Sequence, residues 1–95
     1  MVLGPETYPL ALELLTEAAV VGRLTMDAAI YLSEQYTFEN LASKDALREI
    51  FGIFEHDGYL RKTGAEFRFV SHLLRDWWKA RFEFYYTLVS ERRGQ

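Results

Sequence analysis

The sequence predicts a mainly α-helical fold of the winged-helix type, in which three helices share one core and a two-stranded β-hairpin forms the wing. Two observations lead to this prediction. Apolar residues keep a helical spacing up to Asp57-Gly58, and an alternating spacing replaces it on both sides of Thr63-Gly64. Three helices followed by a hairpin is the order of a winged helix, and we expect a long C-terminal helix in addition.

All 95 residues are expected to form a single domain, because this length suits one hydrophobic core. Residues 1–7 are predicted to be a flexible start, and residues 8–70 the winged-helix core. Residues 71–93 are predicted to be the C-terminal helix.

The first helix is predicted to have Pro9 in its first turn and to run to about Val21, since proline suits the first turn of a helix and Gly22 a helix end. Leu24 then lies in a short extended step. Thr25 is expected to cap a second helix that runs to about Gln35, because its hydroxyl can accept a hydrogen bond from a free backbone N–H group.

The third helix has the clearest apolar spacing of the chain, and Ser43 is its expected cap. Ser71 is the expected cap of the last helix, which meets no helix breaker before Gly94 and can continue for about 20 residues. Large apolar residues of the helices and the hairpin are expected to form the core: Leu14, Ile30, Leu47, Ile50, Phe51, Phe54, Leu60, Phe67 and Phe69.

Composition excludes several classes of protein. The chain has no cysteine and only two histidines, so a disulfide framework and thiol catalysis are excluded and a zinc site is not expected. No apolar run approaches the roughly 20 residues of a membrane span, and the N-terminus lacks the pattern of a signal peptide. We therefore expect a cytoplasmic protein without metal or cofactor. Because no catalytic set can be assembled from the spacing of its residues, we do not expect an enzyme.

Charge is unevenly distributed along the chain. Residues 1–57 contain three basic and ten acidic side chains, a net charge of −7, whereas residues 58–95 contain eight basic and four acidic ones, a net charge of +4. The two halves can neutralise each other within one fold. The alternative is antiparallel association with a second copy of the chain, or contact with a charged neighbour.

Basic residues of the third helix and the hairpin are the candidates for contact with nucleic acid, because the third helix of such folds commonly enters the DNA groove. They are Lys44, Arg48, Arg61, Lys62 and Arg68. The third helix also carries Asp45, Glu49 and Glu55, which DNA phosphates repel. A small dimeric winged-helix DNA-binding protein is therefore the alternative function and not the favoured one.

The predicted last helix carries more large apolar residues than one core-facing side requires. At about 100° per residue, they spread over about 200° or more of its circumference. Either both sides are buried within the domain, or one side is a protein interface. We expect an interface with a second copy in a homodimer or with a neighbouring domain, formed by Trp77, Trp78, Phe82, Tyr85 and Val89.

Two stretches of the chain resemble a known family. Residues 53–61 read IFEHDGYLR, and residues 67–78 read FRFVSHLLRDWW. They are similar to the C-terminal winged-helix region of prokaryotic AAA-type and STAND-type ATPases, where a helix ends in a "dGyL" turn, the wing carries "yrFr" and "LLrdWw" opens the next helix. The resemblance implies an accessory domain that follows a nucleotide-binding core and acts as an interaction or regulatory lever.

The chain itself lacks the phosphate-binding pattern GxxxxGK[ST], so no ATPase activity is expected from it. The favoured function is a winged-helix interaction or regulatory domain, the accessory C-terminal part of an ATPase-like protein. Its partner is expected to be a protein, either the adjacent ATPase domain or another copy of the chain.

Overall fold

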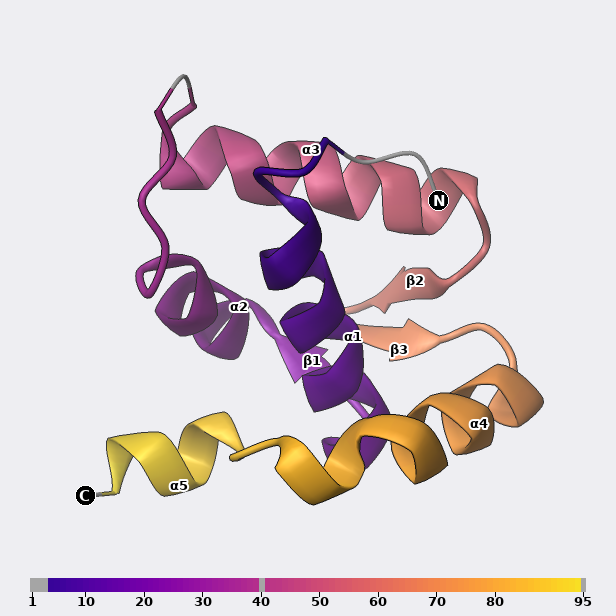
Figure 1. Ribbon diagram of the computed structural model, residues 1–95. Helices are drawn as coiled ribbons and strands as arrows, with labels where there is room; N and C mark the ends of the chain where they lie inside the picture. Colours follow the sequence, from indigo (N-terminus) through magenta and orange to yellow (C-terminus); the bar gives the residue numbers. More distant parts are fainter. Residues whose placement is uncertain (1–3, 40, 95) are drawn as a thin grey trace.

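The computed structural model describes residues 4–39 and 41–94, which form five α-helices, one 3₁₀ helix and a small antiparallel sheet (Figure 1). The elements are α1 (Tyr8–Val21), β1 (Leu24–Thr25), α2 (Met26–Ser33), α3 (Ser43–His56), β2 (Leu60–Thr63), β3 (Glu66–Phe69), α4 (His72–Phe82), η1 (Glu83–Tyr85) and α5 (Val89–Arg93). The mainly helical class is confirmed, together with the hairpin of β2 and β3.

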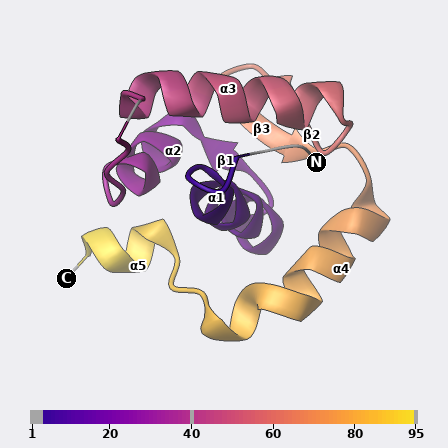
Figure 2. The ribbon, with the colours of Figure 1, turned by 45° about the horizontal axis from the view of Figure 1, so that its top comes forward.

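α1 lies at the centre of the fold. Figure 2 shows it nearly end-on, with the other helices and the sheet arranged around it. Leu10, Leu14 and Ala18 are completely buried on this helix. Pro9 stands in its first turn, and Gly22 ends it with a left-handed φ of 99°, which glycine adopts without strain. The predicted boundaries of the first helix are confirmed to within one residue.

Two of the three predicted caps are present. The hydroxyl of Thr25 accepts a hydrogen bond from the N–H of Ala28, and that of Ser71 accepts one from the N–H of Leu74. Ser43 is not a cap, because the chain already turns into α3 one residue earlier. Extended Ala42 holds the cap position and its carbonyl accepts the first helical hydrogen bonds. α3 therefore starts without a side-chain cap.

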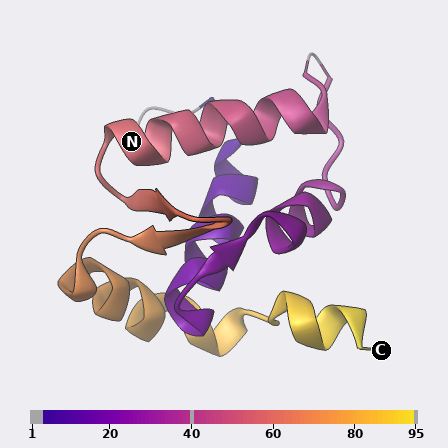
Figure 3. The same ribbon diagram turned by 180° about the vertical axis from the view of Figure 1, so that it is seen from behind.

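The sheet has three strands in the order β1-β3-β2, one more than the predicted hairpin. β1 corresponds to the expected extended step, and Leu24 pairs with Phe67 of β3. Gly64, with φ of 65°, forms the turn between β2 and β3. Figure 3 shows this hairpin between α3 and α4, so the sheet connects the first half of the chain to its C-terminal part.

One hydrophobic cluster includes residues of all five α-helices and the sheet. Phe51 of α3 stacks flat on Phe67 of β3, with ring centroids 4.2 Å apart. Two predicted core positions differ from the structure. Ile30 is exposed, because α2 turns Ala28, Ala29 and Leu32 inward instead, and Phe69 is only partly buried.

The single helix predicted over residues 71–93 is wrong. After α4 the chain forms the short η1, runs extended over residues 86–88 and then forms α5. Aromatic and β-branched residues in this stretch are only moderate helix formers. The hydroxyl of Tyr86 and the backbone N–H of Val89 both donate to Glu17 of α1, at 2.6 and 3.1 Å. These contacts with α1 favour a broken helix over a continuous one.

Of the predicted flexible start, residues 4–7 belong to the described part of the chain and residues 1–3 lie outside it. The backbone N–H groups of Thr7 and Tyr8 both donate to the carbonyl of Gly4 at 3.2 Å, and Thr7 is buried. Residues 4–7 therefore form a hydrogen-bonded turn before α1.

Candidate functional site

The largest exposed apolar side chains of the C-terminal part lie on α4 and η1. Leu73 is 83% exposed, Trp77 53%, Phe84 86% and Tyr85 96%. We call these four residues the α4–η1 face. Monomeric proteins seldom expose several large apolar residues together unless they form an interaction surface.

Helical spacing explains this face. Leu73 and Trp77 are four residues apart and therefore neighbours on one side of α4, and Arg81 follows after four more. The guanidinium of Arg81 lies over the ring of Trp77, 5.4 Å from its centroid. The exposed indole is thus held in place by a cation–π contact.

Trp78 points the other way. It is 7% exposed, and its indole Nε1–H donates to the hydroxyl of Thr16 in α1 at 3.0 Å. Val89 is buried as well, and Phe82 is partly buried against Trp78 with ring centroids 5.0 Å apart. Trp78 and Val89 belong to the core, so their assignment to a partner interface is wrong for the folded chain. Trp77 and Tyr85 remain exposed.

The expected interface omits Leu73 and Phe84, although both are highly exposed. The four-residue spacing from Leu73 through Trp77 was the available signal. Phe84 follows Trp77 by seven residues, so helical spacing also places it on the side of Leu73 and Trp77, opposite Trp78.

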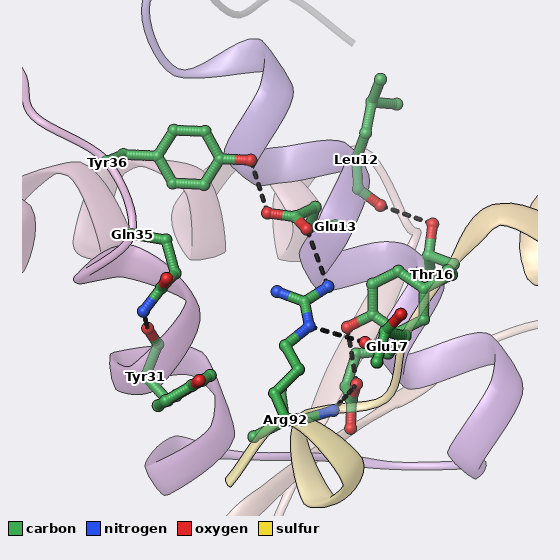
Figure 4. A network of polar contacts seen from close by, with 11 residues as sticks. Leu12, Glu13, Thr16, Glu17, Tyr31, Gln35, Tyr36 and Arg92 are labelled. Carbon is green, nitrogen blue, oxygen red and sulfur yellow. Dashed lines mark hydrogen bonds and ion pairs between the residues drawn. The ribbon is translucent and has the colours of Figure 1, made fainter. Parts of the chain in front are cut away.

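A polar cluster fastens the C-terminal segment to α1. Figure 4 shows Glu13 between Tyr36 and Arg92: it accepts a hydrogen bond from the Tyr36 hydroxyl and one from the Arg92 guanidinium at 3.0 Å. One turn along α1, buried Glu17 accepts from the Tyr86 hydroxyl. Burial, and then the hydrogen bonds to these carboxylates, raise the pKa of both Tyr36 and Tyr86 above its ordinary value. These contacts have a structural role, because they attach the C-terminal segment to α1. We name the group the α1 clasp, and its members are Glu13, Glu17, Tyr36, Tyr86 and Arg92.

Ion pairs join the acidic and basic halves of the chain. Arg92 pairs with Glu13, Arg93 with Asp27, and Arg23 approaches Glu66 at 3.6 Å. The two halves of the chain therefore form ion pairs with each other within one fold, which is the first of the two interpretations of the charge distribution.

The basic candidates for nucleic acid do not form one surface. Arg61 and Arg68 stand opposite each other in the hairpin, whereas Lys62 is one residue along the strand and faces the other side. Arg68 also pairs with Glu66 at 2.7 Å. On α3, Arg48 lies 3.6 Å from Asp45, and Lys44 shares the helix with exposed acidic residues.

A groove of about 780 Å³ runs between α2 and α3. Its floor is apolar and its rim carries charges of both signs. The lining includes Met26, Ile30, Leu47, Phe51, Gly52 and Glu55. The sequence did not reveal this groove, because it exists only where Ile30 is left uncovered between the two helices.

Within residues 4–39 and 41–94, no group of three or more histidine, aspartate or glutamate side chains is placed to hold a metal ion. None of the helices in the same residues is both long and apolar enough to cross a membrane. Comparison of the chain with known protein families, with curated proteins and with solved structures finds no match.

Proposed function

We propose that this chain is a winged-helix protein-interaction domain that binds its partner through the α4–η1 face. The partner is another copy of the chain or a neighbouring domain of an ATPase-like protein. The sheet order β1-β3-β2 and the hairpin that directly follows α3 support the winged-helix assignment. The resemblance of residues 53–61 and 67–78 to the accessory domains of prokaryotic ATPases supports the regulatory role.

One observation carries the proposal. Adjacent Trp77 and Trp78 have opposite environments, and Leu73, Phe84 and Tyr85 of the same segment are exposed as Trp77 is. A large aromatic side chain buries roughly 150–250 Å² when it is covered. At about 25 cal/mol per Å², covering three of them contributes several kcal/mol, part of which the entropy of association offsets.

The charge of α3 favours a protein partner over DNA. Glu49 and Glu55 are exposed on this helix, and Arg48 is next to Asp45. DNA phosphates would be repelled by such a surface, whereas a protein interface accommodates charges of both signs.

The proposal is tested by sedimentation velocity over a range of protein concentrations. We expect the unmodified chain to associate and Phe84→Ser to remain monomeric with an unchanged fold. Tyr8→Ser is the matched control, because Tyr8 is an exposed aromatic residue of α1 and is not part of the α4–η1 face. An unmodified chain that stays monomeric at its highest soluble concentration, or a Phe84→Ser variant that associates equally well, contradicts self-association through this face.

A further inference from the structure

We propose that two copies of this chain associate by exchanging their C-terminal segments, residues 86–93, so that the segment of each copy lies on α1 and α2 of the other. The inference rests on the proposed function and specifies how it is carried out: the α4–η1 faces meet where the two chains cross. Exchange of an identical element is a ready route to a dimer, because it reuses contacts that already exist within one chain.

The C-terminal segment binds to α1 and α2 rather than to α4. The Tyr86 hydroxyl and the Val89 backbone N–H both donate to Glu17 of α1. One turn earlier on the same helix, Glu13 accepts a hydrogen bond from Arg92, and a further ion pair joins the segment to α2. Figure 2 shows α5 apart from α4, joined to it by the connection through η1. The segment is therefore a unit with its own binding site, and α1 and α2 of a second copy offer the same site.

The apolar packing of this segment is slight. Among residues 86–93, all of which the structure describes, Val89 alone is buried. A hollow of about 200 Å³ remains beside it, with Val21 and Ala28 in its lining. Segments with few buried apolar contacts open more readily than the core does. The C-terminal segment can therefore leave α1 of its own chain without unfolding the rest of the domain.

η1 has the properties of the hinge that such an exchange requires. It is a single 3₁₀ turn directly after α4, and the hydrogen bonds of a 3₁₀ turn have poorer geometry than those of an α-helix. Glu83, Phe84 and Tyr85 are all exposed, so packing of their side chains does not oppose a rotation of the backbone. The turn contains neither glycine nor proline, so it can straighten in line with α4.

Exchange also gives the exposed residues of η1 a partner. Among the described residues, Phe84 and Tyr85 are the most exposed large apolar side chains, and both belong to the hinge. With the segments exchanged, the hinges of the two copies run past each other about a twofold axis. Each hinge then covers aromatic side chains of the other that are open to solvent in a single copy. This new contact favours the exchanged dimer over two separate chains.

Charge reversal of one ion pair tests the exchange. One variant carries Glu13→Arg and the other carries Arg92→Glu, so neither forms an opposite-charge pair between these positions within its own chain. In an exchanged heterodimer both sites hold opposite charges, because the two substituted residues meet at one site and the two native residues at the other. The matched control is the chain with both substitutions, which restores an opposite-charge pair within one copy. Circular dichroism checks the fold of each variant.

Native mass spectrometry of equimolar mixtures counts the dimers, since the chains differ in mass. We expect the two single variants to form heterodimers well in excess of random pairing. The doubly substituted chain mixed with the unmodified chain should form fewer heterodimers than random pairing, because exchange between them places like charges together at both sites. Random pairing in both mixtures would show that copies associate with their segments in place, so exchange is wrong while association through the α4–η1 face stands. If the unmodified chain never associates, both proposals fail.

Cross-linking gives a second measurement that does not alter the α1 clasp. Asp27 and Arg93 form an ion pair on the surface, and the chain has no native cysteine. Chains with Asp27→Cys are mixed with chains with Arg93→Cys and treated with a short bismaleimide. We expect a cross-link between the two kinds of chain, because exchange brings position 93 of one copy to position 27 of the other. A dimeric mixture without this cross-link would overturn the exchange.

Discussion

The indole nitrogen of Trp78 donates a hydrogen bond to the hydroxyl oxygen of Thr16 across 62 residues of sequence, at 3.0 Å. The same hydroxyl donates to the carbonyl of Leu12 at 2.7 Å, so the Thr16 oxygen is both donor and acceptor inside the core. Trp78 thereby attaches α4 to α1. Its neighbour Trp77 has no such partner in the core and stays on the surface.

The two adjacent tryptophans should respond very differently to truncation. Trp78→Ala is expected to lower the free energy of unfolding by about 3–5 kcal/mol, because it leaves a cavity and removes the partner of Thr16. Trp77→Ala should cost about 1 kcal/mol or less, since it removes an exposed ring and one cation–π contact. Urea denaturation of both variants measures the difference. Equal losses would contradict the opposite orientations of the two rings.

The α1 clasp should make stability fall in alkaline solution. Tyr86→Phe removes a hydrogen bond to a buried carboxylate and is expected to cost about 1.5–3 kcal/mol at neutral pH. The folded-state pKa of Tyr86 is raised above that of the unfolded chain. The Tyr86 hydroxyl therefore contributes fully to the free energy of unfolding below about pH 10, and this contribution is lost as the pH rises further.

Denaturation curves of the unmodified chain and of Tyr86→Phe, measured from neutral to alkaline pH, check this contribution. The difference between their free energies of unfolding should narrow above about pH 10. A difference that widens there would show that the hydroxyl is not held in its neutral form by Glu17.

Helix caps give a prediction with an internal control. Ser71→Ala should lower the free energy of unfolding by about 1 kcal/mol, because the N–H of Leu74 loses its acceptor. Ser43→Ala should change it by less than about 0.5 kcal/mol, since the Ser43 side chain does not cap α3. Thermal or chemical unfolding of the two variants measures both effects. A larger loss for Ser43→Ala would restore Ser43 as the cap.

Duplex DNA should bind this chain only weakly, in the micromolar range or above at physiological salt, because the basic side chains are dispersed and partly paired. A mobility shift of labelled duplex over a salt series checks this. Sub-micromolar binding that is lost in Arg48→Ala or Arg61→Ala would favour the DNA-binding alternative.

Local patterns were sufficient to predict much of the fold. Apolar spacing identified the buried side of α3, and Gly22 and Gly64 marked a helix end and a hairpin turn, since both depend on the conformation of a few adjacent residues. The break after α4 could not be predicted in this way. It depends on Glu17, which is far away in the sequence and accepts hydrogen bonds from Tyr86 and Val89.

Dependence on residues far apart in the sequence also explains why only some residues of the candidate site could be predicted. A helix with apolar residues on two sides does not reveal which side faces its own core. That choice depends on the tertiary contact between Trp78 and Thr16. Ile30 was likewise placed in the core on its apolar character alone, whereas the orientation of α2 leaves it in the groove.

The central claim is that copies of this chain associate through the α4–η1 face, and the two tryptophan side chains report on this association directly. Nuclear magnetic resonance spectra of the ¹⁵N-labelled chain, recorded from dilute to concentrated solution, resolve each indole N–H group. We predict that the Trp77 signal shifts with concentration, as do the amides of Phe84 and Tyr85, while the Trp78 signal stays constant and exchanges slowly with solvent. Concentration-independent signals at Trp77, Phe84 and Tyr85, or shifts confined to other parts of the chain, would contradict the account.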